Sequence, residues 1–426
     1  MNKEINPSSS PTPWRLFKLG GASVKDAQGV RQAIQLMRSQ GKPPMVLVIS
    51  AMGKTTNALE AVVQSLFTSN PEAAKEKMKE VQAFHQSICD ELELSKEVSL
   101  QVQSFWDEAM RASNTEYAPL YDAVVSAGEL ASTTIVAAAL KALPWPVLWI
   151  DARRVVVTNT DFRRASVDFY ATENNTKDWK ENALIVTQGF IGATPDGVTT
   201  TLGREGSDYT AAVLAYCLSA SEVTVWKDVP GVMSGDPKYF SPVELLKTIP
   251  YREAIELAYY GASVIHPKTV QPLQQKGIAL RVRSFLHPQE VGSWIGDTPV
   301  LDPLTPCFIR KGNQVLVSVS TRDLRFIAEE HLSNIYTLFY QKGVEVNAVQ
   351  HGATHSSFCF THDAIVFPEV LKTLNETFSV TYNVGLELYT IRHATPESLQ
   401  WIRSKGAIYL EQSTRSTAQL LVYCQV

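Results

Sequence analysis

Short, continuous runs of apolar residues alternate with longer segments of mixed polar and apolar residues along the first two thirds of the chain. Such runs are typical of strands that are covered on both faces, and they occupy residues 44–50, 145–151, 183–192 and 222–229. The segments between them predict helices over 24–40, 57–69, 71–113, 121–142 and 207–220. Strands that alternate with helices imply an α/β fold with a mainly parallel sheet sandwiched by helices, whose ligand binds beyond the carboxyl ends of the strands. The glycine-free, charged segment 71–113 is interpreted as a helical insertion near that site.

The last part of the chain repeats a smaller pattern. Residues 296–312 contain three prolines and no clear periodicity, which marks a boundary. The elements predicted beyond it are strand 314–320, helix 323–342, strands 344–350 and 355–362, helix 367–376 with a strand after it, strand 386–393, helix 396–404 and strand 418–424. This order predicts two small α+β units. The later unit is short, as it would be if its strands were shared or intertwined with those of the earlier one.

We therefore expect a disordered leader (1–14), a first domain (15–296), a linker (297–312) and the two α+β units (313–426). The leader is polar and rich in Pro and Ser, and it lacks the apolar core of a signal peptide. No apolar run of about eighteen residues occurs, so no membrane span is expected.

Composition and charge exclude several classes of function. The chain is 45% hydrophobic and 19% charged with a net charge of −4, which is ordinary for a soluble globular protein and gives no basic surface for nucleic acid. Its five cysteines include no Cys-x-x-Cys pair. That spacing argues against a zinc site or a disulfide framework and fits a reducing, cytoplasmic compartment.

The stretch RLFKLGGASVKDAQGV, residues 15–30, contains the first candidate site. An apolar run enters it and a helix-like segment leaves it, so Gly20 and Gly21 lie on a strand-to-helix turn where a ligand can reach the backbone. Free N–H groups of the next helix, the helix dipole and the ammonium of Lys18 would suit an anion. A structural turn with a solvated lysine explains the same residues equally well.

Five further polar segments end predicted strands or begin predicted helices. Each has an ordinary explanation alone: Ser207 and Asp208 as helix caps, Glu129 as a solvated carboxylate, Asp236 in a turn, and His266 in packing or a backbone hydrogen bond. Together they would make a costly surface without a ligand, so we interpret them as one site. The segments are SAMGKTTNAL (50–59), VVSAGELAST (124–133), TLGREGSDYTAAVLAY (201–216), VWKDVPGVMSGDPKYF (225–240) and ELAYYGASVIHPKTV (256–270).

These segments resemble, in their order, the motif set of the aspartokinases, within the amino-acid kinase superfamily. The matching stretches between residues 15 and 296 are KLGGASV, SAMGKTTN, SAGE, QGFIGATPDGVTTTLGREGSD, WKDVPGVMSGDPK and ELAYYGASVIHPKT. The tail from about residue 310 resembles, less closely, the paired ACT regulatory units of that family. The resemblance implies an amino-acid kinase fold in the first domain and an ACT-like regulatory region after it.

The activity implied is transfer of the γ-phosphoryl of MgATP to the side-chain carboxylate of L-aspartate, the first step toward lysine, threonine, methionine and isoleucine. By the resemblance, Lys18 meets the migrating phosphoryl, Glu129 binds the aspartate ammonium and Arg204 its α-carboxylate, and Asp208 orients Lys18. The other residues that the resemblance brings to substrate are Ser50, Thr56 and Ser207. Those that it brings to the phosphates and the nucleotide are Gly20, Gly21, Ser23, Lys227, Asp228, Gly231, Asp236, Lys238 and Ser263. No protein ligand for a metal is expected, because Mg²⁺ would be held mainly by the ATP phosphates.

Several positions depart from the commoner family pattern. Ala22 replaces a threonine of the Gly-Gly turn, Glu205 replaces a glycine, and Lys238 stands where arginine is common. Lys227 replaces a small hydroxyl residue, whereas Ser263 replaces a lysine ahead of the His-Pro pair. We interpret Lys227 as supplying the cation that is lost at Ser263, or alternatively as pointing to solvent or pairing with a nearby carboxylate.

Two other functions stay open. One is a kinase for a different acceptor, such as glutamate or carbamate, and the other is a non-catalytic amino-acid sensor. The ACT-like tail implies regulation by an end-product amino acid, with lysine or threonine expected, although the family's effector-binding pattern is not found and a dimerisation tail without ligand is the alternative. ACT-like units pair edge to edge, so a homodimer or a larger homo-oligomer is expected.

Overall fold

The computed structural model describes residues 13–113, 115–262, 264–323 and 325–424. The described chain forms two compact units. The first unit takes in the residues up to Val232 together with Lys247–Ile255 and Ile265–Leu301. The second unit takes in Met233–Leu246, Glu256–Val264 and the residues from Asp302 onward.

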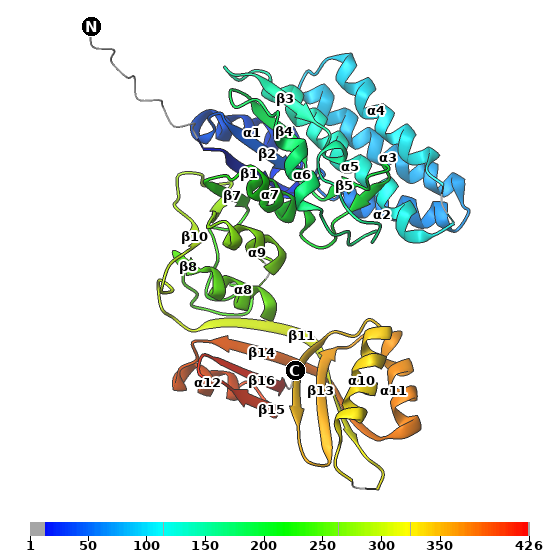
Figure 1. The fold of residues 1–426 in the computed structure, drawn as a ribbon, viewed down its shortest axis with the longest axis vertical. Coiled ribbons are helices and arrows are strands. Elements are labelled where there is room, and N and C mark those ends of the chain that lie inside the picture. Colours follow the sequence, from blue (N-terminus) through cyan, green and yellow to red (C-terminus); the bar gives the residue numbers. More distant parts are fainter. Residues whose placement is uncertain (1–12, 114, 263, 324, 425–426) are drawn as a thin grey trace. The chain divides into compact units, whose positions relative to one another are not determined.

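The first unit is built on an eight-stranded sheet in the order β3-β4-β2-β1-β7-β9-β10-β8 (Figure 1). Neighbouring strands run parallel except β9 and β10. The strands are β1 Arg15–Leu19, β2 Met45–Ile49, β3 Val147–Ile150, β4 Leu184–Gln188, β7 Glu222–Lys227, β8 Thr248–Pro250, β9 Ala279–Ser284 and β10 Ser293–Gly296. Strands β2 and β4 are buried along their whole length, as their continuous apolar sequences require. The predicted α/β class is confirmed.

Helices surround this sheet and supply most of its apolar core. They are α1 Ala27–Gln40, α2 Thr55–Phe67, α3 Pro71–Glu91, α4 Lys96–Arg111, α5 Tyr117–Leu140, α6 Phe169–Thr176, α7 Gly206–Cys217 and α9 Pro267–Gln275. Helix α8, Tyr251–Tyr260, begins in the first unit and ends in the second. A separate two-stranded sheet pairs β5 (Ile191–Ala193) with β6 (Thr199–Thr201). Helices α2 to α5 pack against one another as a layer of their own (Figure 1).

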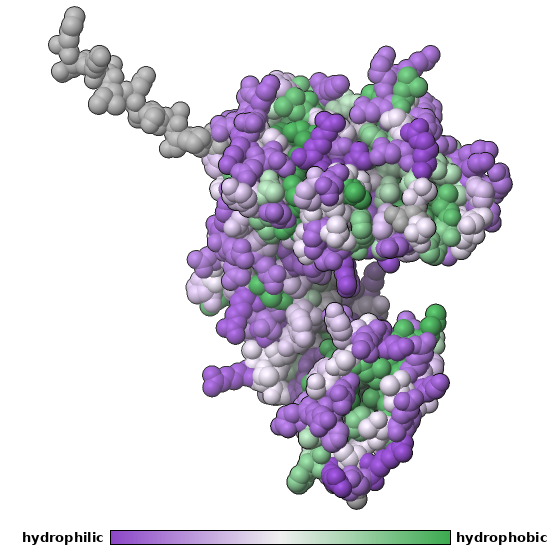
Figure 2. Space-filling model, turned by 45° about the vertical axis from the view of Figure 1, so that its right-hand side comes forward, coloured by the Kyte–Doolittle hydropathy of each residue, from purple (hydrophilic) through white to green (hydrophobic). Residues whose placement is uncertain are grey.

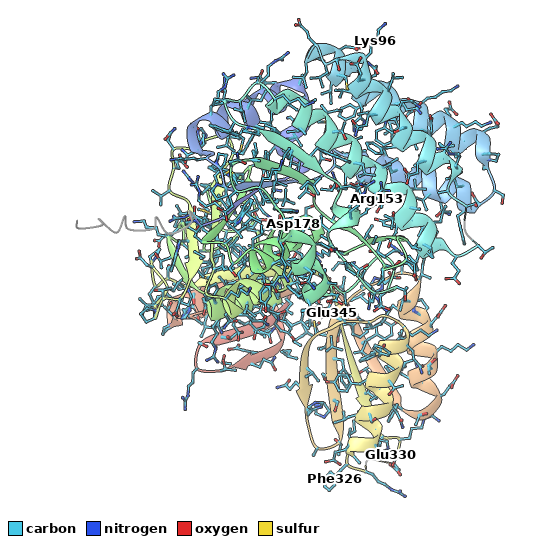
Figure 3. The ribbon with its side chains drawn as sticks, turned by 45° about the horizontal axis from the view of Figure 1, so that its top comes forward. Lys96, Arg153, Asp178, Phe326, Glu330 and Glu345 are labelled. Atoms are coloured by element: carbon cyan, nitrogen blue, oxygen red, sulfur yellow. The ribbon has the colours of Figure 1, made fainter. Side chains whose placement is uncertain are left out.

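The segment 71–113, predicted as one helical stretch, is a pair of helices. Glu93 takes a left-handed conformation (φ 53°), and the N–H of Leu94 donates to the carbonyl of Cys89 at 3.0 Å, which closes α3. Arg153 ties α4 to the turn after β3 by ion pairs to Glu108 (3.0 Å) and Asp151 (2.8 Å); its position is marked in Figure 3.

Helix α5 is long and apolar enough, by length and composition, to cross a membrane. Within the structure 83% of its apolar window is buried against the rest of the protein. That burial is typical of a core helix, and it also encloses the polar side chains of Asp122 and Glu129.

The second unit contains a six-stranded antiparallel sheet in the order β12-β13-β11-β14-β16-β15. Its strands are β11 Cys307–Ser320, β12 Val346–His351, β13 His355–Thr361, β14 Ser379–Arg392, β15 Ala407–Ser413 and β16 Thr417–Tyr423, and its helices are α10 Glu329–Gln341, α11 Val366–Thr377 and α12 Pro396–Arg403. Helices α10 and α11 lie side by side beside β13 (Figure 1). This antiparallel sheet with its helices fits the ACT-like α+β region that was predicted.

Two strands of fourteen residues, β11 and β14, run through both halves of this sheet. The later part of β11 pairs with β13, and the later part of β14 pairs with β16. The two α+β halves therefore share these strands, which was the explanation offered for the short later unit. Residues 307–312 of the predicted linker are strand, and β15 was not predicted.

Two segments from the middle of the sequence pack within the second unit. Phe240 is 2% exposed and lies against the rings of Phe308 and Trp401, with centroids 5.3 and 5.9 Å away. The N–H of Phe308 donates to the carbonyl of Ser234 at 2.7 Å. The segment 233–246 is thus an integral part of the core of the second unit.

The surface is mixed rather than dominated by one charge or by apolar side chains. On the face drawn in Figure 2, hydrophilic residues cover most of both units, with smaller hydrophobic areas among them. Exposed large apolar side chains occur in both units, for example Tyr170 (77%) in the first and Ile365 (79%) and Tyr340 (85%) in the second.

A buried histidine makes the stability of the first unit depend on pH. His85 on α3 is 0% exposed, contacts the carbonyl of Val81 through Nδ1 at 2.8 Å, and packs on Trp106. Burial lowers its pKa to about 4. Between about pH 4 and the ordinary histidine pKa of about 6.5, the unfolded chain therefore binds a proton at His85, whereas the folded chain does not.

We therefore expect the free energy of unfolding to fall as pH is lowered from about 6.5 to about 4, and His85→Gln to reduce the slope in this window. Urea unfolding at a series of pH values measures the slope. The exposed His287, changed to Gln, is the matched control in the same unit. An unchanged slope in His85→Gln would contradict the assignment.

Candidate active site

The turn after β1 packs directly on the turn after β2. A Cβ at Gly21 would lie 2.4 Å from the carbonyl oxygen of Ala51, so only glycine fits there without a shift of the backbone. The N–H of Gly53 donates to the carbonyl of Gly21 at 3.0 Å. Gly20 has more space, because a Cβ there would lie 3.6 Å from Lys18 Nζ. The glycine pair thus lets two loops meet at the carboxyl ends of their strands.

Lys18, Asp208 and Lys227 form an ion cluster at this edge of the sheet. Lys18 Nζ lies 2.7 Å from Oδ1 of Asp208, and Lys227 Nζ lies 3.1 Å from Oδ2 of the same carboxylate. The Asp208 side chain is only 4% exposed. Burial by itself would raise the pKa of Asp208, but the two ammonium groups outweigh it and hold the pKa below its usual value. Asp208 is therefore an ionised, buried carboxylate that holds two lysines.

Glu129 on α5 is a second buried carboxyl group, in a different state. It is 3% exposed, and its Oε2 has no hydrogen-bond partner among the described residues. Burial raises its pKa to about 8, although a backbone hydrogen bond from Ala51 and the charge of Lys18 act in the opposite direction. The neighbouring Gly128 allows α5 to approach α2, since a Cβ there would lie 3.0 Å from Thr55 Cγ2. The free Oε2 atom offers an acceptor to an incoming cation, which would favour the ionised form of Glu129.

The structure contradicts the helix-cap explanation for the polar residues at the start of α7. Ser207 and Asp208 are not caps, because both lie inside the first turn of the helix. Glu205 occupies the cap position with a left-handed backbone (φ 53°) and makes no side-chain capping bond. A Cβ at Gly206 would lie 2.6 Å from Phe190 Cδ2, so this turn needs glycine for close packing. The helix start thereby directs Asp208 toward Lys18 and Lys227.

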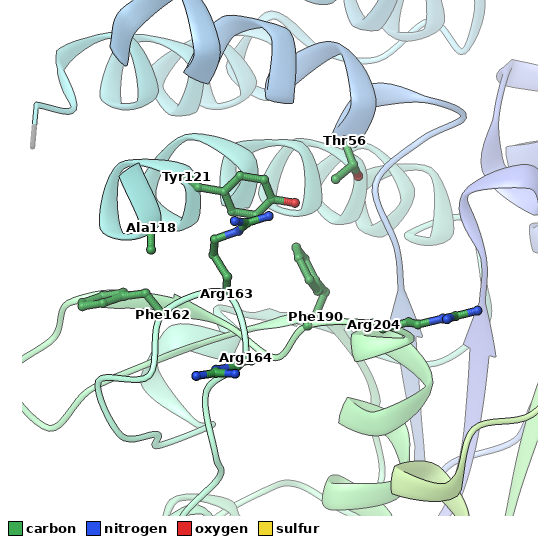
Figure 4. Close-up of a pocket in the computed structure, with 9 residues that line it drawn as sticks. Thr56, Ala118, Tyr121, Phe162, Arg163, Arg164, Phe190 and Arg204 are labelled. Carbon is green, nitrogen blue, oxygen red and sulfur yellow. The ribbon is translucent and has the colours of Figure 1, made fainter. Parts of the chain in front are cut away.

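A cavity of about 630 Å³ opens beside this helix start. Its lining residues, most of which are labelled in Figure 4, are Thr56, Ala118, Tyr121, Phe162, Arg163, Arg164, Phe190, Gly203 and Arg204. Thr56 and Arg204 were predicted for the substrate site, and the structure places both on this cavity. In Figure 4 the Arg204 side chain points away from those of Arg163 and Arg164.

The opposite wall of the cavity was missed by the sequence analysis. The N–H of Arg163 donates to the fully buried carboxylate of Asp122 at 2.9 Å, and the Arg163 guanidinium lies 4.7 Å from the ring centroid of Tyr121. Asp122 also accepts from the N–H of Thr201 at 2.8 Å. The Arg-Arg pair is visible in the sequence, but it follows no predicted strand end, and nothing local connects it with Asp122.

The remaining predicted residues are distributed over several loops. Ser23 is buried, and its N–H donates to the carbonyl of Gly20 at 3.0 Å. The carbonyl of Ser50 accepts from Ser132 Oγ at 2.7 Å. A Cβ at Gly189 would lie 2.4 Å from the Cβ of Ser207, so β4 and α7 are in close contact. These contacts fix the loops and leave the roles of the residues as predictions.

The predicted nucleotide loop is divided between the two units. Asp228 and Gly231 belong to the first unit, and Asp236 and Lys238 to the second. Asp236 Oδ1 accepts from the N–H of Lys238 at 2.9 Å, as expected for an aspartate in a turn. Ser263 lies outside the described residues.

His266 is the cap residue at the start of α9. His266 Nδ1 accepts from the N–H of Lys268 at 3.2 Å, which confirms a backbone hydrogen bond at the start of α9.

Among the described residues, no group of three or more His, Cys, Asp or Glu side chains could hold a metal ion.

The chain is similar to known proteins over most of its length. The model of the amino acid kinase family matches residues 13–284. The chain is 29% identical to lysine-sensitive aspartokinase 3 of Escherichia coli (strain K12) over 389 residues, which cover 88% of this chain and 86% of that protein. It is 30% identical to the chloroplastic aspartokinase 2 of Arabidopsis thaliana over 376 residues, which cover 85% of this chain and 69% of that protein.

A longer protein and a solved crystal structure are also similar to this chain. The chain spans 42% of the chloroplastic bifunctional aspartokinase/homoserine dehydrogenase 1 of Arabidopsis thaliana, so it corresponds to part of that protein. Its fold matches the crystal structure of E. coli aspartokinase III in complex with aspartate and ADP, with a TM-score of 0.78, 25% identity and 96% coverage of both chains. The chain therefore belongs to the amino acid kinase family and, within it, to the aspartokinases.

Proposed function

We propose that the chain is an aspartate kinase, which transfers the γ-phosphoryl of MgATP to the side-chain carboxylate of L-aspartate. The products are ADP and 4-phospho-L-aspartate. The observation that carries the proposal is the buried Lys18–Asp208–Lys227 cluster at the strand ends, with the buried carboxyl of Glu129, whose Oε2 has no partner among the described residues, in the same unit. The E. coli relative of the same fold holds aspartate and ADP.

The chemical step needs positioning and charge neutralisation more than covalent help from the protein. The aspartate side-chain carboxylate is ionised at pH 7, so it attacks the γ-phosphorus without a general base. The bond from that phosphorus to the ADP oxygen breaks as the new P–O bond forms. Lys18 meets the charge on the phosphoryl group, oriented by Asp208, and Gly20, Gly21 and Ser23 surround it with donors.

The acceptor is recognised by its ammonium and its α-carboxylate. In this proposal Glu129 binds the ammonium, and Arg204 binds the α-carboxylate through two parallel hydrogen bonds. Thr56, Ser50 and Ser207 complete the polar lining. The orphan Oε2 of Glu129 and the position of Arg204 on the cavity support this assignment.

The nucleotide is assigned to the loops that follow β7 and α8. Asp228, Gly231, Asp236, Lys238 and Ser263 are the residues proposed there, with Lys227 beside the phosphates. Mg²⁺ would enter with ATP and be held mainly by its phosphates, where it would offset their charge.

Two other functions fit less of the structure. A kinase for another acceptor would use the same cluster, but the carboxyl of Glu129 and the guanidinium of Arg204 favour an amino acid over carbamate. A non-catalytic sensor would not need an ionised Asp208 bound to two lysines at the strand ends.

We further propose that the ACT-like region regulates the enzyme through an end-product amino acid, lysine or threonine, and that it joins chains into a homodimer or larger homo-oligomer. The lysine sensitivity of the E. coli relative and the exposed apolar residues of the second unit support these points. The five free cysteines support a cytoplasmic location. The boundaries of the leader, the catalytic domain, the linker and the regulatory units stay proposals. Titration of activity with lysine, threonine and methionine tests the regulation.

The proposed activity predicts ADP release that depends on aspartate. With MgATP and aspartate at millimolar concentrations, the purified chain should release ADP, and glutamate or carbamate should give far less. A coupled ADP assay with the three acceptors measures this. A folded sample without aspartate-dependent release would refute the proposal.

The second prediction separates chemistry from binding. Lys18→Met should lower kcat by about 10³ or more with a much smaller change in the KM for aspartate, because it removes charge stabilisation in the transition state. Arg204→Ala should raise mainly the KM for aspartate, because it would hold a group remote from the reaction. Near-normal turnover in Lys18→Met would show that the lysine does not meet the phosphoryl group.

The third prediction concerns pH. Glu129 with its pKa raised to about 8 is mostly protonated at pH 7, whereas binding of the substrate ammonium favours the carboxylate. The KM for aspartate should therefore fall by up to about tenfold as pH rises from 7 to 8.5. Glu129→Gln should raise the KM and abolish this dependence, whereas the exposed Glu181→Gln should retain it. A starting protein whose KM is constant over this range would contradict the role of Glu129.

A further inference from the structure

Two positions that depart from the common motif, Glu205 and Lys227, meet in the structure. Lys227 Nζ lies 3.8 Å from Oε2 of Glu205 and 3.1 Å from Oδ2 of Asp208. The two residues are 22 positions apart in the sequence, one at the start of α7 and the other at the end of β7. They therefore form a pair that the sequence pattern alone does not show.

Strand geometry puts Lys227 beside Lys18. The strands β1 and β7 are parallel neighbours, and Lys18 is in register with Val225. Lys227 is two residues beyond Val225, so its side chain leaves the sheet on the same face as that of Lys18. Both lysines are mostly buried, with side chains 9% and 18% exposed. Two ammonium groups thus converge at the carboxyl ends of two central strands.

Glu205 brings a second carboxylate to this cluster. Asp208 supplies one buried negative charge for two ammonium groups, and Glu205 supplies the second. The Glu205 contact is longer than either contact of Asp208, and its side chain is 35% exposed. A loose and partly solvated ion pair contributes little stability and can be exchanged at small cost. Glu205 is therefore the replaceable partner, whereas Asp208 is the fixed one.

Glu205 places a negative charge at the start of α7. Its backbone is left-handed (φ 53°), a conformation that glycine adopts more readily than other residues. The helix dipole favours a carboxylate at this end of the helix. The same carboxylate contacts Lys227.

We propose that Lys227 is a second phosphate-binding cation beside Lys18, and that Glu205 is its resting counter-ion, which the polyphosphate of the nucleotide displaces. The proposal rests on the proposed ATP-dependent function. It assigns Glu205, a position outside the predicted site set, a positioning role that acts through Lys227. The incoming phosphates replace the Glu205 carboxylate on Lys227, while Asp208 keeps both lysines in place.

Equilibrium binding of MgATP, measured by calorimetry without aspartate, tests the pair. Lys227→Met should weaken binding by about tenfold or more, because a charge-assisted contact is lost. Glu205→Gln should tighten binding by about twofold to fivefold, because the competing charge is removed. In the Lys227→Met background Glu205→Gln should have no effect, which is the non-additivity expected of a shared contact.

Controls separate this role from a purely structural one. Lys227→Arg should restore most of the MgATP affinity, and the exposed Lys177→Met should leave it unchanged. Inorganic tripolyphosphate should lose affinity in Lys227→Met in parallel with MgATP, whereas the KM for aspartate should change little. Thermal unfolding of each variant verifies that the fold is kept.

MgATP affinity within twofold of the starting protein in a folded Lys227→Met variant would overturn the proposal. An equal effect of Glu205→Gln with and without Lys227 would overturn the pairing. Failure here is distinguishable from failure of the proposed function. If MgATP binding depends on Lys227 but no aspartate-dependent ADP release is seen, aspartate is rejected as the acceptor and the Glu205–Lys227 pair is kept. If turnover is normal but MgATP binding does not depend on Lys227, the pair is rejected and the aspartate kinase function is kept.

Discussion

The site depends on one buried carboxylate that is shared by two ammonium groups. Asp208 would be costly to bury as an unpaired charge, and Lys18 and Lys227 would repel each other without it. The three residues come from β1, β7 and α7, so the attraction of both lysines to Asp208 holds the helix against the two strands. Electrostatics and packing therefore specify the same arrangement, and a cation can be held ready at the strand ends before any anionic ligand arrives.

The glycines around this cluster serve the same end by sterics. Gly21 lets the turns after β1 and β2 touch, Gly206 lets α7 start against Phe190, and Gly189 lets β4 approach Ser207. Each removes a side chain where two backbones or a backbone and a ring come together. The loops that carry the polar groups are thus brought close by the absence of Cβ atoms.

Much of this could be predicted from the sequence, for physical reasons. Continuous apolar runs identified β2, β4 and β7, because a strand that is covered on both faces has no polar alternation. A similar run identified β3, although β3 is an edge strand that is only partly buried. The ordered motifs singled out Lys18 and Asp208, which the structure places 2.7 Å apart, and their roles stay predictions. The division of 71–113 was missed because Glu93, rather than a glycine, takes the left-handed conformation that ends α3. The wall around Arg163 was missed because it depends on Asp122, which is 41 residues away in the chain. The contact between Glu205 and Lys227 was likewise hidden by sequence distance.

The packing of Phe240 has a consequence for how the chain can be divided. Its partners Phe308 and Trp401 come from the second unit, and the chain passes between the two units several times before Asp302. A fragment that stops at Leu301 would keep the segment around Phe240 but lose the side chains that cover it. Such a fragment would present a large apolar surface to water and would be prone to self-association. The boundary that looks natural in the sequence is thus a poor place to cut the polypeptide, because its modules are discontinuous.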